Sequence, residues 1–278
     1  MQKKLLVAVL GTLFAIPALA DDAPYTITTN VGFVTDYTFR GISQTFREPA
    51  IQGGIDFNHK NGLYLGTWAS NISSNQYTNA NMEWDFYGGY NGTVNEDLGY
   101  SLGLITVYYP GGVTSTTAPT RKWDTTEWNI GATWKGLNVK YSQTLTNWYG
   151  VDATGGGFNP SFWTAADTAI TGATGATTAN SAAANSKGSG YIEANYTFTL
   201  GEDVSLALHA GHQTIKNFNA LGYSDYKVGV SKPFGGFTFG AAYTSTNAAD
   251  TNLYDAAANN QRKNLRGGIL ALSVSRSF

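Results

Sequence analysis

GILALSVSRSF, residues 268–278, decides the fold of this chain, because its side chains alternate in kind up to the last residue. The even positions, except Arg276, are apolar and end in Phe278, whereas the odd positions after Ile269 are alanine and serine. Successive side chains of a β-strand point to opposite faces. The stretch therefore predicts a strand with one apolar and one polar face.

The same stretch resembles the C-terminal signature of bacterial outer-membrane β-barrels, which end in an aromatic residue with apolar residues at every second position before it. This resemblance implies that Phe278 is an assembly signal, read by the barrel-assembly machinery.

The N-terminal segment predicts export. Lys3 and Lys4 precede an apolar run over residues 5–16, and Ala18-Leu19-Ala20 supplies the small residues of a cleavage site. The run is shorter than the roughly 20 residues that a spanning helix needs. We therefore expect a cleaved signal peptide over residues 1–20 and a single domain over residues 21–278, located in the cell outer membrane.

The composition of the expected mature chain favours strands. Without Lys3 and Lys4, the 17 basic residues fall to 15 against 19 acidic ones, and this balance excludes the basic surface of a nucleic-acid-binding protein. The absence of cysteine excludes a disulfide framework and a lipoprotein-type lipid attachment. Because no mature stretch is long and apolar enough for a spanning helix, a membrane span would have to consist of strands.

Alternation with period two predicts twelve strands, over residues 25–41, 50–58, 62–72, 82–93, 98–109, 125–135, 137–149, 190–200, 204–213, 222–232, 236–246 and 265–278. The connections are short after even-numbered strands and long after odd-numbered ones. This pattern is typical of an outer-membrane barrel. We expect an all-β, transmembrane, antiparallel up-and-down barrel, whose even strand number places both termini on the periplasmic side.

Two structural alternatives accompany this prediction. In the strand over residues 62–72, Leu63 and Leu65 alternate with Tyr64 and Trp68, so either face fits lipid. A secreted β-sandwich alternates as well, but a strict succession of short and long connections is not typical of Greek-key folds. Tryptophan and tyrosine near the ends of the apolar faces also favour a lipid interface.

A family resemblance extends over residues 31–111. VGFVTDYTFRGISQT (31–45), PAIQGG (49–54) and GLYLGTWASN (62–71) resemble the opening of the TorF family of proteobacterial porins, and EWDFYGGY (83–90) and YYPG (108–111) are later echoes. The resemblance implies an outer-membrane barrel that forms a pore, and it implies no particular substrate.

In a barrel the polar strand faces line the interior. The inward ionisable residues predicted on this basis are Asp36, Arg40, Asp56, Glu83, Asp85, Glu127, Lys140, Glu193, His209, Asp225 and Lys227. Acidic residues outnumber basic ones among them, and wall charges of one sign set ion preference, so we expect a weak preference for cations. Alternatively, these charges pair across strands and form a structural network.

The pore itself is expected to be narrow or plugged. Eight strands enclose packed side chains and sixteen leave an aqueous channel, so twelve lie between these cases. The glycine-rich loop over residues 150–189, with Phe158, Phe162 and Trp163, either folds inward as a constriction or stays outside as a flexible loop.

No chemistry beyond transport is indicated. His59, His209 and His212 do not converge as metal ligands, no paired nucleophile and base is evident, and we expect neither enzyme activity nor a cofactor. The expected function is passive diffusion of small hydrophilic solutes, and the alternative is a non-conducting adhesin or receptor that acts through its long loops. The expected partners are outer-membrane lipid, lipopolysaccharide, the barrel-assembly machinery and small solutes; the oligomeric state is left open.

Overall fold

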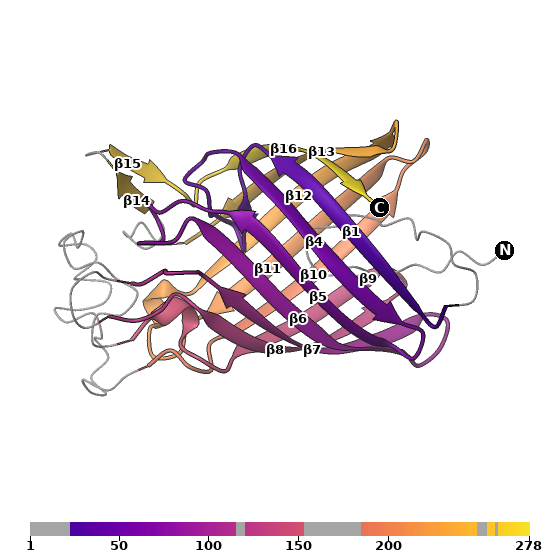
Figure 1. Cartoon of the computed structure of the whole chain (residues 1–278), viewed down its shortest axis with the longest axis horizontal. Coiled ribbons are helices and arrows are strands. Elements are labelled where there is room, and N and C mark those ends of the chain that lie inside the picture. Colours follow the sequence, from indigo (N-terminus) through magenta and orange to yellow (C-terminus); the bar gives the residue numbers. More distant parts are fainter. Residues whose placement is uncertain (1–22, 115–119, 153–184, 249–254, 259–260) are drawn as a thin grey trace.

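A computed structural model describes residues 23–114, 120–152, 185–248, 255–258 and 261–278, and within them twelve antiparallel strands close into one barrel (Figure 1). The ring is closed by the pairing of the first and last strands, with Phe33 opposite Val274. In chain order its strands are β1 (Tyr25–Val34), β4 (Ala50–His59), β5 (Leu63–Asn71), β6 (Met82–Thr93), β7 (Leu98–Tyr108), β8 (Thr125–Trp134), β9 (Leu137–Thr144), β10 (Gly190–Thr199), β11 (Ser205–Thr214), β12 (Tyr223–Phe234), β13 (Phe237–Thr246) and β16 (Ile269–Ser277). The predicted all-β barrel of twelve strands is confirmed.

Four smaller elements lie in the long connections. They are the hairpin of β2 (Thr38–Phe39) and β3 (Ile42–Ser43), the hairpin of β14 (Asp255–Ala258) and β15 (Gln261–Asn264), and the single 3₁₀ turns η1 (Trp148–Gly150) and η3 (Asn219–Leu221). None of the helices in the described part of the chain is long and apolar enough to cross a membrane.

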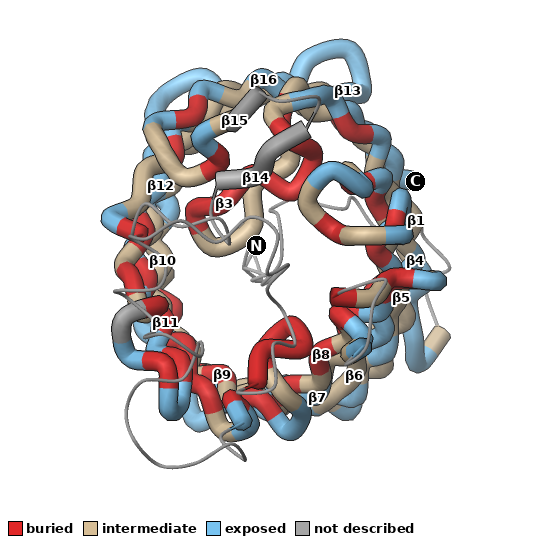
Figure 2. The backbone as a smooth tube through the Cα atoms, turned by 90° about the vertical axis from the view of Figure 1, so that its left-hand side faces the viewer, coloured by how far each residue is buried: buried red, intermediate tan, exposed pale blue. Residues whose placement is uncertain are grey.

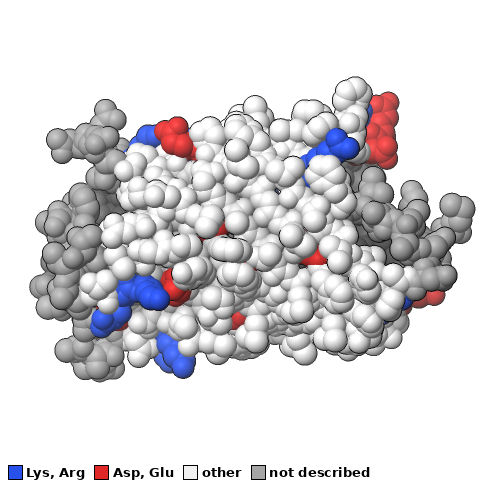
Figure 3. All heavy atoms as spheres, viewed as in Figure 1, with Lys and Arg blue, Asp and Glu red and all other residues white. Residues whose placement is uncertain are grey.

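The outer face of the barrel is apolar, as the alternation predicts. Ile51, Leu65 and Leu270 are 67%, 63% and 67% exposed on this face, and Figure 3 shows charged side chains mostly toward the two ends of the barrel. Leu63 also points outward, which settles the ambiguous third strand in favour of its leucine face. A band of this kind matches the hydrocarbon layer of a membrane.

The short turns gather at one end of the barrel, and both chain ends meet them there. Tyr25 at the start of β1 pairs with His59 beside the first short turn. At the other terminus, the Phe278 amide donates to the Thr29 carbonyl at 2.8 Å, and the Thr29 amide donates to the Phe278 carbonyl at 3.1 Å. The placement of this end on the periplasmic side stays a prediction.

Three strand boundaries differ from the prediction by four residues or more, each at the long-loop end, whereas the others agree within two residues. The first strand ends at Val34 instead of Gly41, the seventh ends at Thr144 instead of Tyr149, and the last begins at Ile269 instead of Leu265. The alternating pattern continues past each boundary, but these apolar side chains pack inside the barrel. Tyr37 and Phe39, which share the outward face of the predicted first strand with Phe33, are therefore interior residues.

Candidate functional site

The loop of residues 35–49, which we call the inward loop, folds into the barrel. Figure 2 shows its strand β3 inside the ring of barrel strands. Arg40 and Gly41 form the two-residue turn of the β2–β3 hairpin, with φ values of 43° and 82°, and such turns need left-handed backbone at both positions. A Cβ atom on Gly41 would lie 2.6 Å from the Asp225 Cβ on β12, so the hairpin tip meets the wall closely.

Arg40 fastens this tip to the far side of the barrel. Its Nη1 donates to Glu127 Oε1 at 2.9 Å and to Gln213 Oε1 at 3.0 Å, and its Nη2 donates to Glu127 Oε2 at 2.6 Å. Glu127 on β8 and Gln213 on β11 lie across the ring from β1, which leads into the loop. Because the Arg40 and Glu127 side chains are only 9% and 6% exposed, this is a buried ion pair.

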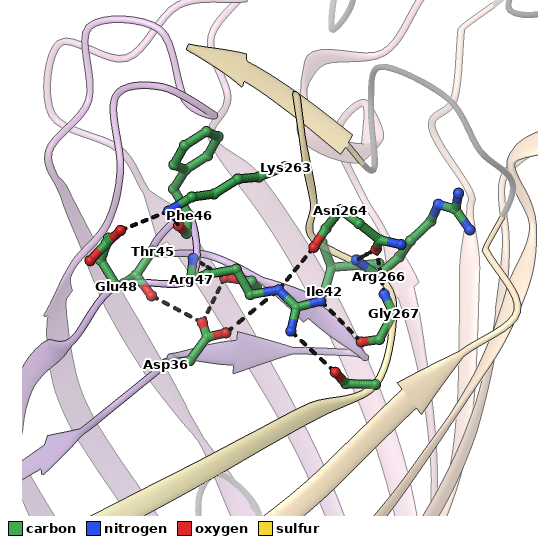
Figure 4. Close-up of polar contacts among 12 residues, drawn as sticks. Asp36, Ile42, Thr45, Phe46, Arg47, Glu48, Lys263, Asn264, Arg266 and Gly267 are labelled. Atoms are coloured by element: carbon green, nitrogen blue, oxygen red, sulfur yellow. Dashed lines mark hydrogen bonds and ion pairs between the residues drawn. The ribbon is translucent and has the colours of Figure 1, made fainter. Parts of the chain in front are cut away.

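The root of the inward loop is held by the segment that precedes β16 (Figure 4). Arg47 donates to three backbone carbonyls there, those of Asn264 at 2.9 Å, Gly267 at 3.2 Å and Gly268 at 3.3 Å. Lys263 reaches back to the loop, where its Nζ donates to the Phe46 carbonyl at 3.0 Å and lies 2.7 Å from Glu48 Oε1. Root and tip are thus fastened by separate sets of contacts.

Asp36 organises the inside of the same root. Its Oδ1 accepts from Ser43 Oγ at 2.6 Å and from Thr45 Oγ1 at 3.2 Å, and its Oδ2 lies 4.0 Å from Arg47 Nε. Burial raises the pKa of the Asp36 carboxyl, while the two hydroxyl donors and Arg47 oppose that shift. Burial of the carboxylate is therefore the dominant influence on the pKa of Asp36.

An interior apolar cluster occupies the long-loop end of the barrel. Tyr77 stacks on Tyr109 with ring centroids 4.9 Å apart, and Tyr149 meets Phe39 of the inward loop at 6.4 Å. All six long connections contribute to the cluster, whose buried members are Ile42, Phe46, Ile72, Tyr77, Ala80, Val107, Tyr109, Trp123, Trp148, Tyr149, Val151, Ile215, Phe218, Leu221, Tyr223, Ala248 and Leu265. This end of the barrel is thus packed like a protein core.

We call the strands β4, β5 and β6 the acidic wall, because their interior side carries carboxylates. Two of these carboxylates accept hydrogen bonds from tyrosine hydroxyls. Asp56 Oδ1 accepts from the Tyr87 hydroxyl at 2.6 Å. The two oxygens of Glu83 accept from Tyr37 at 2.6 Å and from Tyr109 at 2.5 Å. Burial and the charge of Glu83 raise the pKa of the Tyr37 and Tyr109 phenols, so these groups stay neutral donors.

Asp85, the third carboxylate of the acidic wall, accepts no hydrogen bond from a tyrosine in the described part of the chain. It is 4% exposed, and its buried Oδ1 has no hydrogen-bond partner within the described residues. A buried charge in this state is costly, so Asp85 is the least satisfied of the three carboxylates on the acidic wall.

The opposite side, β8 to β12, which we call the paired wall, holds its carboxylates in another way. Besides the Arg40–Glu127 pair, Lys140 Nζ lies 2.8 Å from Glu193 Oε1. Asp225 lies 2.9 Å from His209 Nε2 and also accepts from the Tyr191 hydroxyl at 2.9 Å. Each of the three acids on this wall thus has a basic side chain beside it.

The predicted inward residues all lie in the interior, although two of them reach it differently. Asp36 and Arg40 were expected on the face of the first strand, but they belong to the inward loop, because the tight turn at Arg40 and Gly41 reverses the chain. Lys227 has no ion pair within the described residues. The pairing alternative therefore describes the three acids of the paired wall. It fails for Lys227 and for the acidic wall.

Sequence reasoning missed three features. Gln213 and Tyr191 share the polar strand faces with the predicted residues, so their position gave a usable signal. The interior apolar cluster also had a signal, since the long loops are rich in aromatic residues. The loop of residues 150–189 was expected either to fold inward as a constriction or to stay outside, and its residues 153–184 lie outside the described part. The missed feature is the loop of residues 35–49, which enters the barrel. In the described ranges, no group of three histidine or acidic side chains is placed to hold a metal ion.

The fold is a closed antiparallel barrel of twelve strands with an apolar outer face, as in outer-membrane barrel proteins. The chain matches the family described as "Bacterial protein of unknown function (Gcw_chp)" over residues 18–278, and it belongs to that family. This match does not confirm the TorF name. None of the curated proteins matches the sequence.

Solved porin structures resemble the barrel at low sequence identity. The NanC porin has 10% identity and a TM-score of 0.50, and the alignment covers 90% of this chain and 98% of that one. The KdgM porin in complex with disordered oligogalacturonate has 8% identity and a TM-score of 0.48, with 91% and 98% covered. OprD from Pseudomonas aeruginosa has 11% identity and a TM-score of 0.36, with 93% and 68% covered. The NanC likeness supports the fold alone.

Proposed function

We propose that this protein is an outer-membrane channel for the passive diffusion of small hydrophilic solutes, with a weak preference for cations. The observation that carries the proposal is the acidic wall. Asp56, Glu83 and Asp85 line the interior of a closed barrel, and within the described residues none of them has a cationic partner. These three acids outnumber Lys227, which has no ion pair in the described part of the chain, and an excess of wall charges of one sign sets ion preference.

The inward loop and the interior apolar cluster make this channel a restricted one. The β2–β3 hairpin reaches the paired wall, and aromatic side chains pack around it at the long-loop end. Small solutes and small single-channel conductance steps are the expected consequence.

The same cluster favours a second candidate. If the packing at the long-loop end stays closed, the protein is a non-conducting surface protein that acts through its outer loops. This candidate and the channel differ in one measurable property, which is ion conduction.

Planar-bilayer recordings of the purified barrel in a KCl gradient test the two candidates. We expect small conductance steps with a reversal potential on the cation side, and larger steps when residues 37–45 are replaced by two glycines. Lys60→Ala in a short turn is the control and should conduct as the wild type does. Silence of both the wild type and the shortened variant would overturn the channel and support the surface protein.

We further propose that Phe278 is read by the barrel-assembly machinery and that lipid and lipopolysaccharide surround the apolar outer face. Phe278 is 54% exposed on that face. Phe278→Ser should reduce the folded protein in outer-membrane fractions and leave the conductance of each inserted barrel unchanged. Phe234→Ser, at an exposed aromatic beside a short turn, is the matched control; equal insertion of all three proteins would contradict this role.

A further inference from the structure

We infer that Glu127, Gln213 and Tyr191 form a guanidinium-binding site in the barrel wall, which Arg40 occupies as a ligand from within the chain. Glu127 offers two carboxylate oxygens to the guanidinium edge, at 2.9 and 2.6 Å. Gln213 adds a third acceptor at 3.0 Å, and the Tyr191 ring lies under the group, 4.1 Å from Cζ to the ring centroid. A planar cation is thus met on its edge and on its face.

The site is preorganised by contacts that do not involve Arg40. Gln213 Nε2 donates to the carbonyls of Gly190 at 3.0 Å and Thr214 at 3.2 Å, which turns its Oε1 toward the guanidinium. The Tyr191 hydroxyl donates to Asp225, and its ring lies over Gly211, where a Cβ atom would collide with it. Because these residues stand on the barrel strands β8, β10 and β11, the site persists when the hairpin tip moves.

Arg40, by contrast, stands on a small and separable element. The β2–β3 hairpin has only two residue pairs, Thr38 with Ser43 and Phe39 with Ile42. The root of the inward loop is fastened elsewhere, through Arg47 and Lys263 (Figure 4). A displacement of the tip therefore leaves the root contacts in place.

The chemistry of the site selects its ligand class. When Arg40 withdraws, Glu127 becomes an uncompensated carboxylate in a poorly solvated place, and such a group requires a cation. The two carboxylate oxygens and the ring face fit a planar guanidinium better than a spherical ammonium. Solutes that carry a guanidinium group therefore compete with Arg40 for this site. They are the solute class that we infer for the channel, and this functional meaning rests on the proposed channel.

Calorimetric titration of the folded barrel in detergent with methylguanidinium tests the site without a need for conduction. Arg40→Ala should bind this probe, and Arg40→Ala/Glu127→Gln should bind it at least about tenfold more weakly, because hydrogen bonds to a charged group are lost. Methylammonium should bind Arg40→Ala more weakly than methylguanidinium. Equal binding of the probe by both variants, or no binding by Arg40→Ala, would overturn the inference. If Arg40→Ala does not fold, Arg40→Gln takes its place in the same comparison.

Bilayer recordings then connect the site to the pore. Methylguanidinium should alter the step size of the wild type more than potassium does at equal concentration, and this difference should vanish in Arg40→Ala/Glu127→Gln. If the barrel binds the probe in calorimetry but does not conduct, the proposed channel is contradicted and the guanidinium site is supported. If the barrel conducts but does not bind the probe in calorimetry, the guanidinium site is contradicted and the channel is supported.

Discussion

The acidic wall and the paired wall of this barrel carry the same number of predicted carboxylates, but they satisfy them by different means. On the acidic wall, tyrosine hydroxyls serve Asp56 and Glu83, and Asp85 Oδ1 has no partner in the described ranges. On the paired wall, basic side chains serve all three acids. The difference shows that strand alternation fixes where a carboxylate points and leaves open whether its charge is neutralised.

One local arrangement recurs on both walls and makes the comparison sharper. Tyr87 lies over Gly66 and donates to Asp56, and Tyr191 lies over Gly211 and donates to Asp225. In each case a Cβ atom on the glycine would collide with the ring. Only the second tyrosine also carries the Arg40 guanidinium on its face. The same local arrangement thus lies in a different electrostatic environment on each wall, because only the paired wall receives a guanidinium from the inward loop.

Glu127→Gln should produce the largest loss of stability. The substitution leaves the Arg40 guanidinium buried without a counter-charge, which costs about 3 kcal/mol in the free energy of unfolding. Urea unfolding in micelles, followed by tryptophan fluorescence, measures it. The control is Glu202→Gln, whose side chain is 88% exposed beside Lys232 and should change little. A similar loss in both variants would remove the distinction between buried and exposed pairs.

Asp85→Asn should instead increase the stability of the barrel. It replaces a buried carboxylate with an unpartnered oxygen by a neutral amide of the same shape, so we expect the free energy of unfolding to rise by about 1 kcal/mol. Asp56→Asn is the matched variant on the same wall and should lower it, because the strong bond from Tyr87 weakens. The same unfolding assay decides, and a loss of stability in Asp85→Asn would show that its charge is compensated.

Ion preference should follow the unpaired acids. A charge about 10 Å from a permeating ion in water contributes about 0.4 kcal/mol, or about twofold in the permeability ratio. Asp56→Asn/Asp85→Asn should therefore bring the K⁺/Cl⁻ permeability ratio toward one, as read from reversal potentials. Lys140→Gln/Glu193→Gln removes an ion pair of zero net charge and should leave the ratio as it is. An equal shift in both double variants would count against the acidic wall as its source.

The smallest expected effect concerns pH at the root of the inward loop. Because burial raises the pKa of the Asp36 carboxyl above its value in the unfolded chain, the folded state binds this proton more tightly. Stability therefore rises as the pH falls from above the raised pKa to the unfolded value near 3.8. Hydrogen exchange of residues 36–47 at pH 7 and pH 4 measures the change. Asp36→Asn should remove it, and an unchanged pH response in that variant would exclude Asp36 as the titrating group.

The sequence alone determined the barrel, because a strand in a membrane must alternate lipid-facing and interior side chains. That local rule located twelve strands, assigned the leucine faces to lipid, and placed nine of the ionisable candidates on the interior wall. It failed at Tyr37 and Phe39, where the same alternation belongs to a loop that packs inside.

Only the tertiary structure decided how the interior is used. The Arg40–Glu127 pair joins residues 87 positions apart, and the Arg40–Gln213 bond joins residues 173 positions apart. Neither contact has a periodic signal, because each depends on a loop that leaves its strand and crosses the barrel. Local alternation therefore fixes the wall of this protein, whereas long-range packing fixes which of its charges remain available to a solute.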